Sequence, residues 1–313
     1  MRIKALSFFP AVGWGGMDTS EFAVNESGAG MRLDIFLTGR LDGVSRSRVQ
    51  AAIRGGFVLL NGGPARPSEP LSSGDVVVWT PPSAVAVTGV EAEDLPLRIL
   101  YEDAHILAVD KAAGMVVHPG AGHFTGTLVG ALMHHSRELS GVGGDPTRAG
   151  IMHRLDKETS GCLLVAKTDR AHAALAEQFA GRDVRKIYLA RVAGIPRRTF
   201  GTIDAPIARH PHHRQKMAVS ENERGREAVT EYRVLLTDGK TSLLECRPKT
   251  GRTHQIRVHL KSIGHPVLGD PLYGQRGPYT RHMLHAYKIA FLHPVTRKPM
   301  EICAPPTEPL LQI

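Results

Sequence analysis

One charged loop of the sequence contains the residue types that catalysis by a carboxylate requires. Asp156 lies between Arg154 and Lys157, shortly before an apolar run that begins at Cys162. The flanking cations favour the charged form of a carboxylate, so Asp156 should stay ionised. A structural salt bridge at the end of a strand is the bland alternative, because it uses the same residue types. Ser160 is a second possible nucleophile, although no motif places a base beside it.

Motifs that bind common cofactors are absent from the sequence. It contains no G-x-x-x-x-G-K-[ST] phosphate loop, no H-E-x-x-H motif and no G-x-S-x-G elbow. The glycines of 141–144 lie in a loop rich in Ser, Asp and Pro, and such a loop does not form a dinucleotide site. The 16 histidines lack carboxylate or thiol partners at metal-ligand spacing. We therefore expect neither a metal nor another cofactor.

Strand-like and helix-like segments from Leu97 onward must position the charged loop. Many strands with few intervening helices indicate an α+β domain on a large mixed or antiparallel sheet. Apolar runs predict strands at 106–110, 115–118, 162–167, 187–192, 228–236 and 241–247. Helical spacing predicts helices at 127–135, 171–179 and 253–263.

A smaller unit precedes this domain and begins at Met31. Apolar residues at helical spacing predict a helix from Leu33 to Leu41, and a second helix ends at Arg54 with Ser45 as its N-cap. Two short strands, 57–60 and 76–79, follow the helices. The stretch from Arg32 to Arg54 has five Arg and two Asp, a net charge of +3.

This unit resembles a small RNA-binding module named after a small-subunit ribosomal protein, called here the S-four-like domain. The resemblance covers residues 31–80 and rests on Arg32-Leu33-Asp34, Ser45-Arg46-Ser47-Arg48 and the segment 58–62. It implies a small α/β domain whose helix pair lies on structured RNA. Three arginines would then meet phosphates, namely Arg32, Arg46 and Arg48.

Composition limits the classes to which the chain can belong. Its 39 Lys and Arg against 30 Asp and Glu give a net charge of +9, which points to a polyanionic partner. Three cysteines without a C-x-x-C pair exclude a disulfide scaffold and indicate a reducing compartment. No apolar run reaches the roughly 18 residues of a membrane span, so we expect no membrane partner.

Ordered blocks of the larger domain resemble one enzyme family. His153-Arg154-Leu155-Asp156, followed by Thr159-Ser160-Gly161, is similar to the signature of the RluA/RluD-type pseudouridine synthases. Further blocks match that family in order and spacing, and together they span about two thirds of the chain, from residue 97 to 305. These blocks are 110–119, 186–188, 209–211, 216–219, 250–260 and 284–294.

The resemblance implies an activity and residue roles. Such enzymes detach uracil from ribose C1′, turn the base and rejoin it through C5, which needs no cofactor. Asp156 would stabilise the positive charge that develops on the sugar. Whether it attacks C1′ or removes a sugar proton stays open. Tyr188 would stack on the flipped base, and Arg252 would pair with Asp156. Arg154 would bind RNA beside the flipped nucleotide. A core tyrosine and a phosphate contact are the simpler alternatives for Tyr188 and Arg252.

A second basic segment runs from Arg182 to Arg226 and has a net charge of +7. Such a run is often only a solvated face. Between two strands, and in a chain that resembles a family that clamps RNA, the segment predicts a hairpin that grips RNA phosphates. Its candidate phosphate ligands are Arg209, Arg214 and Lys216. The segment 209–217, together with the S-four-like unit, resembles the branch of the family that acts on large-subunit ribosomal RNA, with transfer RNA as the second candidate substrate.

The sequence therefore predicts a monomeric, cytoplasmic RNA-modifying isomerase with an α+β catalytic domain. A non-catalytic RNA-binding or ribosome-assembly factor is the alternative from another class, and a nuclease lacks the metal ligands that it would need. The predicted boundaries are a disordered extension over 1–30, the S-four-like domain over 31–80, a linker over 81–96, the catalytic domain over 97–306 and a tail over 307–313.

Overall fold

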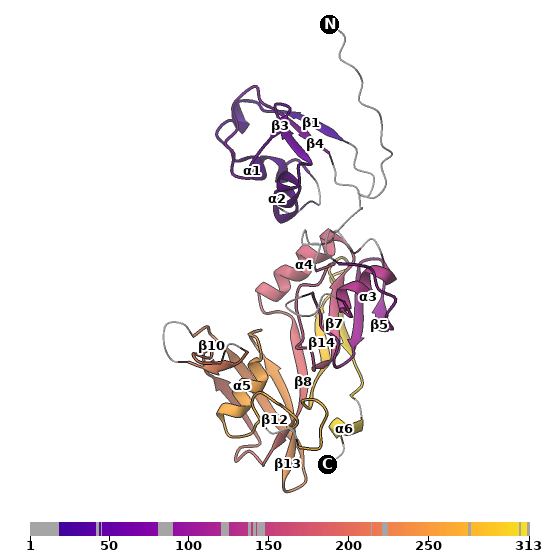
Figure 1. The fold of residues 1–313 in the computed structure, drawn as a ribbon, viewed down its shortest axis with the longest axis vertical. Coiled ribbons are helices and arrows are strands. Elements are labelled where there is room, and N and C mark those ends of the chain that lie inside the picture. The colour runs from indigo at the N-terminus through magenta and orange to yellow at the C-terminus, as the bar shows by residue number, and fades with distance from the viewer. Residues whose placement is uncertain are drawn as a thin grey trace.

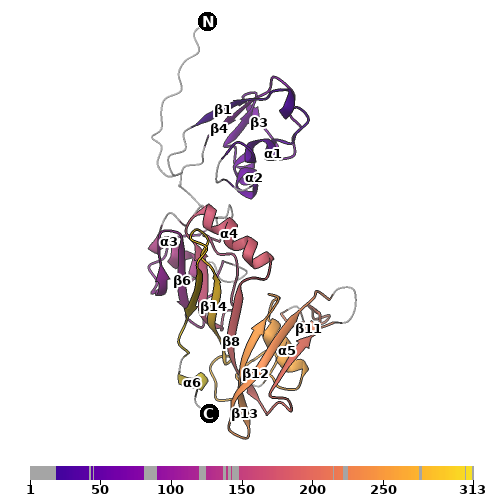
Figure 2. The same ribbon diagram turned by 180° about the vertical axis from the view of Figure 1, so that it is seen from behind.

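The computed structural model describes residues 19–311, apart from 42–43, 45, 81–89, 120–124, 137–138, 140–141, 143–147, 214, 221–224, 275–276 and 307. The strands before residue 81 and those after residue 89 form separate sheets (Figures 1 and 2).

The N-terminal sheet is antiparallel and is packed against two short helices, α1 (Leu33–Thr38) and α2 (Arg46–Arg54). Their shared core includes Phe36 and Trp79, which are at most 1% exposed. The two predicted helices and the two predicted strands are confirmed, although the first helix ends earlier than expected. The expected N-cap of α2, Ser45, lies outside the described residues. The strands, in the order β1-β4-β2-β3, are β1 (Ser20–Ala23), β4 (Val76–Trp79), β2 (Val58–Leu60) and β3 (Gly63–Pro64).

The N-terminal domain begins before Met31, which corrects the expected extent of the disordered extension. Strand β1 pairs with β4 along its whole length, and Val24 is buried in the core. A 3₁₀ turn, η1 (Glu26–Gly28), then leads into α1. A strand of four residues has too few alternating positions to be recognised from its pattern. Residues 1–18 of the predicted extension lie outside the described residues.

The larger sheet is mixed, as the sequence predicts. Its nine strands follow the order β5-β6-β7-β14-β8-β13-β12-β9, and β15 pairs with the second half of β14. Every pairing is antiparallel except that of β7 with β14. The strands are β5 (Arg98–Glu102), β6 (Ile106–Lys111), β7 (Ser160–Ala166), β8 (Arg185–Ala193), β9 (Phe200–Asp204), β12 (Val229–Thr237), β13 (Thr241–Pro248), β14 (Leu284–Leu292) and β15 (Pro299–Cys303).

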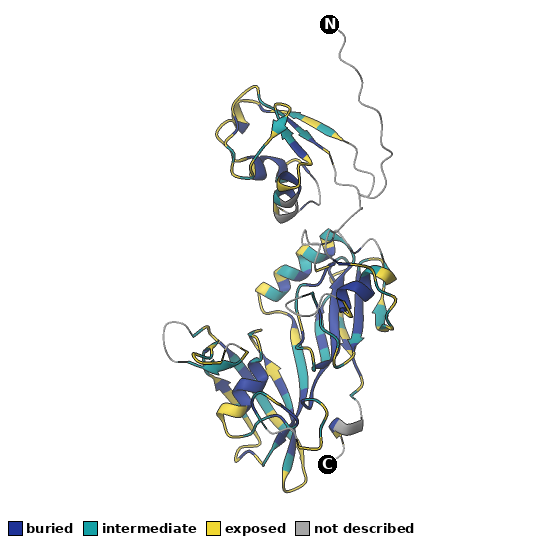
Figure 3. Ribbon diagram, viewed as in Figure 1, coloured by how far each residue is buried: buried dark blue, intermediate teal, exposed yellow. Residues whose placement is uncertain are grey.

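Strand β7 is buried on both faces, which explains its unbroken apolar sequence. Leu163 and Val165 pack beneath α3 (Leu128–His135), whereas Leu164 and Ala166 pack beneath α4 (Asp169–Ala180). Figure 3 shows this centre of the sheet as almost entirely buried. Threonine N-caps begin both helices. The charged loop therefore leads into the best-buried strand of the domain.

Helix α5 (Gln255–Ser262) packs on β12 and β13, and a separate two-stranded hairpin, β10 (Ile207–Arg209) and β11 (Met217–Val219), lies beside it (Figure 2). The three helices predicted for this domain are confirmed. The strand predicted at 115–118 is wrong, since Val116 forms only an isolated bridge with Thr127.

Two other predicted boundaries need correction. Within the predicted linker, Val90 is buried in the catalytic core, and the Glu93 carboxylate accepts a hydrogen bond of 2.7 Å from the backbone N–H of Gly126. The acidic residues of this segment predicted a linker, but the Glu93 carboxylate instead holds the turn before α3. Within the predicted tail, α6 (Glu308–Leu311) places Leu310 in the core at 0% exposure.

Gly161 enables the close parallel contact between β7 and β14. Its φ is +113°, and an added Cβ would lie 2.3 Å from the carbonyl oxygen of Ala286. Gly114 also has a positive φ, of +86°, but an added Cβ there would meet nothing within 4 Å. We therefore expect Gly161→Ala to lower the free energy of unfolding by about 1 to 3 kcal/mol more than Gly114→Ala does. Urea unfolding of both variants measures the difference, and equal losses would contradict this account of the strand contact.

Candidate active site

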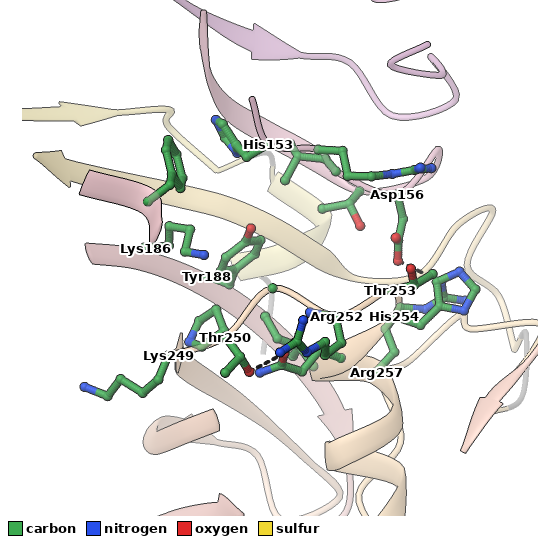
Figure 4. A pocket seen from close by; sticks show the side chains of 18 of the residues that line it. His153, Asp156, Lys186, Tyr188, Lys249, Thr250, Arg252, Thr253, His254 and Arg257 are labelled. Carbon is green, nitrogen blue, oxygen red and sulfur yellow. Dashed lines mark hydrogen bonds and ion pairs between the residues drawn. The ribbon is translucent and has the colours of Figure 1, made fainter. Parts of the chain in front are cut away.

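A cleft of about 570 Å³ opens where the charged loop, strand β8 and the turn before α5 meet. Figure 4 shows Asp156, Thr253 and His254 at one end of this cleft, with Lys186 and Lys249 at the other. Four of the sequence-predicted site residues line it together, namely Arg154, Asp156, Tyr188 and Arg252.

The charged loop is held at its start by His153. Its Nε2 accepts a hydrogen bond of 2.9 Å from the backbone N–H of Leu164 in β7, and its ring stacks on Phe179 of α4. Burial, assisted by the positive charge of Lys186, lowers the pKa of His153 from 6.5 to about 3. The imidazole is therefore neutral near pH 7, as an acceptor must be.

A buried lysine holds the far side of the same loop. Lys111, only 1% exposed, ends β6 and donates from Nζ to the carbonyls of Ala112, Met115 and Lys157 at 2.8 to 3.0 Å. Gly114 donates its N–H to the same Lys157 carbonyl at 2.9 Å. Burial lowers the pKa of Lys111 to about 8. Sequence reasoning gave Lys111 no role, although a cation that ends an apolar strand is a usable signal.

Ser160 is not placed to act as a nucleophile. A histidine does lie beside it, because Ser160 Oγ and His285 Nδ1 are 2.9 Å apart. His285 donates from Nε2 to the carbonyl of Ala304, so the hydroxyl proton of Ser160 must point to Nδ1. The two residues are at most 6% exposed, and neither lines the cleft. This pair instead joins the start of β7 to the start of β14. Thr159 and His282, 2.8 Å apart, join the residues just before the same two strands.

Asp156 is held by an arginine of α5 rather than by its sequence neighbours. Arg257 donates from Nη1 to Asp156 Oδ2 at 2.9 Å. The other edge of the guanidinium binds Asp270 through Nε at 2.7 Å and Nη2 at 2.9 Å. The Arg257 side chain is 4% exposed and that of Asp270 is fully buried, whereas that of Asp156 keeps 21% exposure. Two carboxylates paired with one guanidinium leave the cluster with a net negative charge. Asp156 is the member of the cluster that is exposed to the cleft.

Asp270 is ionised despite its burial. Burial alone opposes the charged form, but hydrogen bonds from Arg257 and the backbone outweigh it and lower the pKa of Asp270. The guanidinium is thus fixed from behind, and it presents one N–H group to Asp156 in a defined direction.

The predicted pairing of Arg252 with Asp156 is wrong. Arg252 lines the cleft but donates from Nε to the backbone carbonyl of Glu227 at 2.9 Å. Both arginines belong to the segment 250–260, and the sequence alone did not separate them. The sequence signal that favours Arg257 as the partner of Asp156 is its place between the apolar Ile256 and Val258. The helix that contains it is buried from Gln255 to Leu260.

Tyr188 lies on β8 with its ring exposed to the cleft and its back against two apolar cores. Burial, and secondarily the charge of Asp156, raises the pKa of its hydroxyl. No described residue hydrogen-bonds to that hydroxyl. The ring is therefore a flat, rigid wall next to the carboxylate, as stacking on a base would need.

Cations surround the mouth of the cleft. Arg154 is exposed and forms no ion pair with any described residue, whereas Arg182 makes a two-point pair with Glu227 at 2.9 and 3.0 Å. Lys186 and Lys249 also line the cleft, at the end away from Asp156 (Figure 4), and Lys249 is paired with Glu231 at 2.9 Å. Burial lowers the pKa of Lys186. The cleft thus combines one carboxylate with several cationic groups at its edge.

The other predicted RNA ligands lie away from this cleft. Arg209 and Lys216 are brought together by the β10–β11 hairpin, where the backbone N–H of His210 bonds to the carbonyl of Lys216. Arg214 lies outside the described residues, as does the side chain of Arg48.

Arg32 and Arg46 are joined by a buried carboxylate in the N-terminal domain. Asp34 is 0% exposed, and it accepts from Arg32 at 3.0 Å, from Arg46 at 3.0 Å and from Gln50 at 2.5 Å. The hydrogen bond from Arg32 is the largest of several effects that lower the pKa of Asp34. Each guanidinium remains about half exposed, so Asp34 fixes two neighbouring cations at the surface.

Among the described residues, no cluster of three or more His, Cys, Asp or Glu could hold a metal ion. Nor does any described helix have both the length and the apolar character needed to cross a membrane.

The stability of the protein should fall in mild acid. His153 is neutral in the folded protein down to about pH 3, whereas in the unfolded chain it gains a proton near its ordinary pKa of 6.5. Below pH 6.5 the unfolded state therefore binds more protons, and each such histidine costs at most about 1.4 kcal/mol per pH unit. His282, with a pKa near 3 caused mainly by burial, adds to the effect.

We expect His153→Gln to be less stable than the parent protein at pH 7.5, but to lose less further stability between pH 7.5 and 5.5. His134→Gln, at a largely exposed position, is the control and should keep the parent slope. Urea unfolding at the two pH values tests this, and identical slopes for all three proteins would show that His153 does not stay neutral.

Comparison with known proteins matches two family models to the chain. Residues 105–262 match a model described as RNA pseudouridylate synthase, and residues 31–77 match the S4 domain. The ribosomal large subunit pseudouridine synthase D of Xanthomonas campestris pv. campestris is 45% identical, with 93% of this chain and 90% of that protein covered. The protein of the same name from Zymomonas mobilis subsp. mobilis is 44% identical, with 92% and 94% covered.

A solved structure has the same catalytic fold. The human RNA pseudouridylate synthase domain containing 1 protein superposes with a TM-score of 0.56 at 28% identity, covering 68% of this chain and 84% of that chain.

Proposed function

The chain belongs to the RNA pseudouridylate synthase family, and we propose that it converts specific uridines of large-subunit ribosomal RNA to pseudouridine. The observation that carries the choice of RNA is the similarity to two relatives named for the large ribosomal subunit, which extends over more than 90% of this chain. This range includes the N-terminal domain as well as the catalytic domain.

Asp156 is the catalytic carboxylate in this proposal. The reaction breaks the bond between C1′ and N1, forms a bond between C1′ and C5, and moves the C5 proton so that N1 ends protonated. The sugar gains positive character as the first bond breaks, and a nearby carboxylate stabilises it. Asp156 serves either route left open by the sequence, attack on C1′ or removal of a sugar proton. Arg257 pairs with this carboxylate and keeps it aimed into the cleft.

Tyr188 and the cations at the cleft edge hold the nucleotide. The target base must leave its stack, which costs a few kcal/mol, and a flat aromatic ring beside the carboxylate offsets part of that cost. Arg154 and Arg252 lie on the same cleft and would meet the phosphates or sugar of the flipped nucleotide. Arg252 is thus an RNA-binding residue in this proposal, in place of its expected pairing with Asp156.

The remaining RNA contacts come from two basic surfaces. The first comprises Arg32 and Arg46, held side by side by Asp34; Arg48, whose side chain lies outside the described residues, is assigned to it from the sequence alone. The second is the β10–β11 hairpin with Arg209, Arg214 and Lys216. Both fit the net charge of +9, because phosphate contacts supply most of the affinity of such surfaces.

Removal of the Asp156 charge should abolish pseudouridine formation and leave the fold and RNA binding in place. The test compares Asp156→Asn with Asp204→Asn, an exposed carboxylate on β9 outside the cleft, in a strain that lacks the gene. Pseudouridine mapping of ribosomal and transfer RNA then reads the product. We expect the parent and Asp204→Asn to restore sites in large-subunit RNA. Restoration by Asp156→Asn would remove Asp156 as catalyst, and sites confined to transfer RNA would overturn the proposed substrate.

Phosphate binding by the hairpin should appear in the salt dependence of RNA affinity. For the double variant Arg209→Gln/Lys216→Gln, we expect the slope of log Kd against log salt to fall by about 1 for each phosphate that is no longer neutralised. Arg233→Gln, on an exposed part of β12 outside the cleft and the hairpin, is the matched control. Equal slopes for the parent and the double variant would exclude the hairpin from phosphate binding.

A further inference from the structure

His254 lies in the cleft in an unusual backbone conformation. It precedes α5 with φ of 58° and ψ of 18°, the left-handed region, in which Asn, Asp and His are the least disfavoured residues other than Gly. Figure 4 shows it next to Thr253 and close to Asp156, and its ring is only partly buried. The mechanism above gives it no role.

The Tyr273 hydroxyl favours one tautomer of His254, because Nδ1 is the acceptor that the described residues offer to the hydroxyl proton. Its oxygen accepts a hydrogen bond of 2.7 Å from the backbone N–H of Met217 and lies 2.8 Å from His254 Nδ1. With Met217 as donor to the oxygen, the one hydroxyl proton is free to point to Nδ1. In a neutral ring, an accepting Nδ1 requires that Nε2 carry the hydrogen.

The ring is kept in that neutral form by its surroundings. Burial is the main cause that lowers the pKa of His254, and the positive charges of Arg257 and Arg154 act in the same direction. Asp156 and Asp270 oppose them without reversing the result. The Nε2–H group has no acceptor among the described residues, although the ring lines the cleft.

We propose that His254 binds the target nucleotide by donating from Nε2–H to one of its ribose or phosphate oxygens, and that Tyr273 positions this donor. The inference rests on the proposed function, because it requires an RNA nucleotide in the cleft. Tyr273 is a positioning residue, since it acts on the nucleotide only through His254.

The same hydroxyl connects the β10–β11 hairpin to His254. Met217 begins β11, next to Lys216, so hairpin, Tyr273 and His254 form one hydrogen-bonded series. The Tyr273 ring also lies 5.0 Å from the guanidinium carbon of Arg257. Because Tyr273→Phe keeps this ring contact and removes only the hydroxyl, it separates the hydrogen-bond role from packing.

Asparagine is the discriminating substitution at His254. It tolerates the left-handed backbone, and its side-chain oxygen can accept from Tyr273 near the position of Nδ1. It has no group that reaches the position of Nε2. His254→Asn therefore removes the proposed donor while it keeps the turn and the tie to the hairpin.

The experiment measures pseudouridine formation on a large-subunit RNA fragment by His254→Asn, Tyr273→Phe and the double variant, with Tyr287→Phe as control. Tyr287 is partly buried, and its hydroxyl bonds to no described residue. We expect His254→Asn to lower kcat/KM about tenfold, mainly through KM, as removal of one hydrogen bond would. Tyr273→Phe should cost several-fold in the parent background and almost nothing further in the His254→Asn background.

Three results would each overturn the inference: parent-like kcat/KM for His254→Asn, an equal cost of Tyr273→Phe in both backgrounds, or losses that follow a lowered Tm. The parent enzyme separates this inference from the proposed function. If the parent makes no pseudouridine in the fragment, the proposed substrate fails, whereas an active parent with an unimpaired His254→Asn variant overturns the role of His254 alone.

Discussion

The Arg257 guanidinium is the group on which the geometry of the cleft depends. It lies buried between a fully buried carboxylate, Asp270, and a partly exposed one, Asp156. A buried charge is tolerated only when it is paired and hydrogen-bonded, so loss of Asp270 would leave the guanidinium without its second partner. Asp156 and Arg257 are 101 residues apart, so the ion pairs join the charged loop to α5 and to the turn after Val267, which is close to α5 in sequence. The arrangement that supports catalysis is therefore also part of the fold.

Hydrogen bonds to backbone groups hold the charged loop in addition to these ion pairs. His153 accepts from the backbone of β7, and Lys111 gathers three carbonyls at the base of the charged loop. Burial keeps His153 neutral near pH 7, whereas Lys111, with a pKa of about 8, stays largely protonated and donates to three carbonyls. Hydrogen bonds of defined direction therefore fix the loop. Such bonds keep the Asp156 backbone in place while its carboxylate stays accessible. A carboxylate has catalytic value only when its direction is set before the substrate arrives.

The sequence predicted those features that arise from local patterns. The apolar run of β7, the stripe of α4 and the charged loop before them were all recognisable, because each depends on neighbouring residues. The choice of Arg257 over Arg252 was not, since it depends on Asp270, which approaches from another part of the chain. The same applies to β1, which forms a strand by pairing with β4. It also applies to Glu93, an acidic residue typical of a linker, because its role depends on its contact with Gly126. Long-range partners decided each of these corrections.

The distribution of charge also sorts the parts of a bound RNA. Phosphates carry the negative charge of the polymer, and the cations at the cleft edge, Arg154 among them, attract that charge. Asp156 would repel a phosphate that reached its position in the cleft, because the net charge of Asp156, Asp270 and Arg257 together is negative. The neutral base and the sugar are thus the parts that can reach the carboxylate at low cost. Positive charge develops on that sugar during the proposed reaction, so the repulsion that excludes phosphate becomes attraction for the transition state.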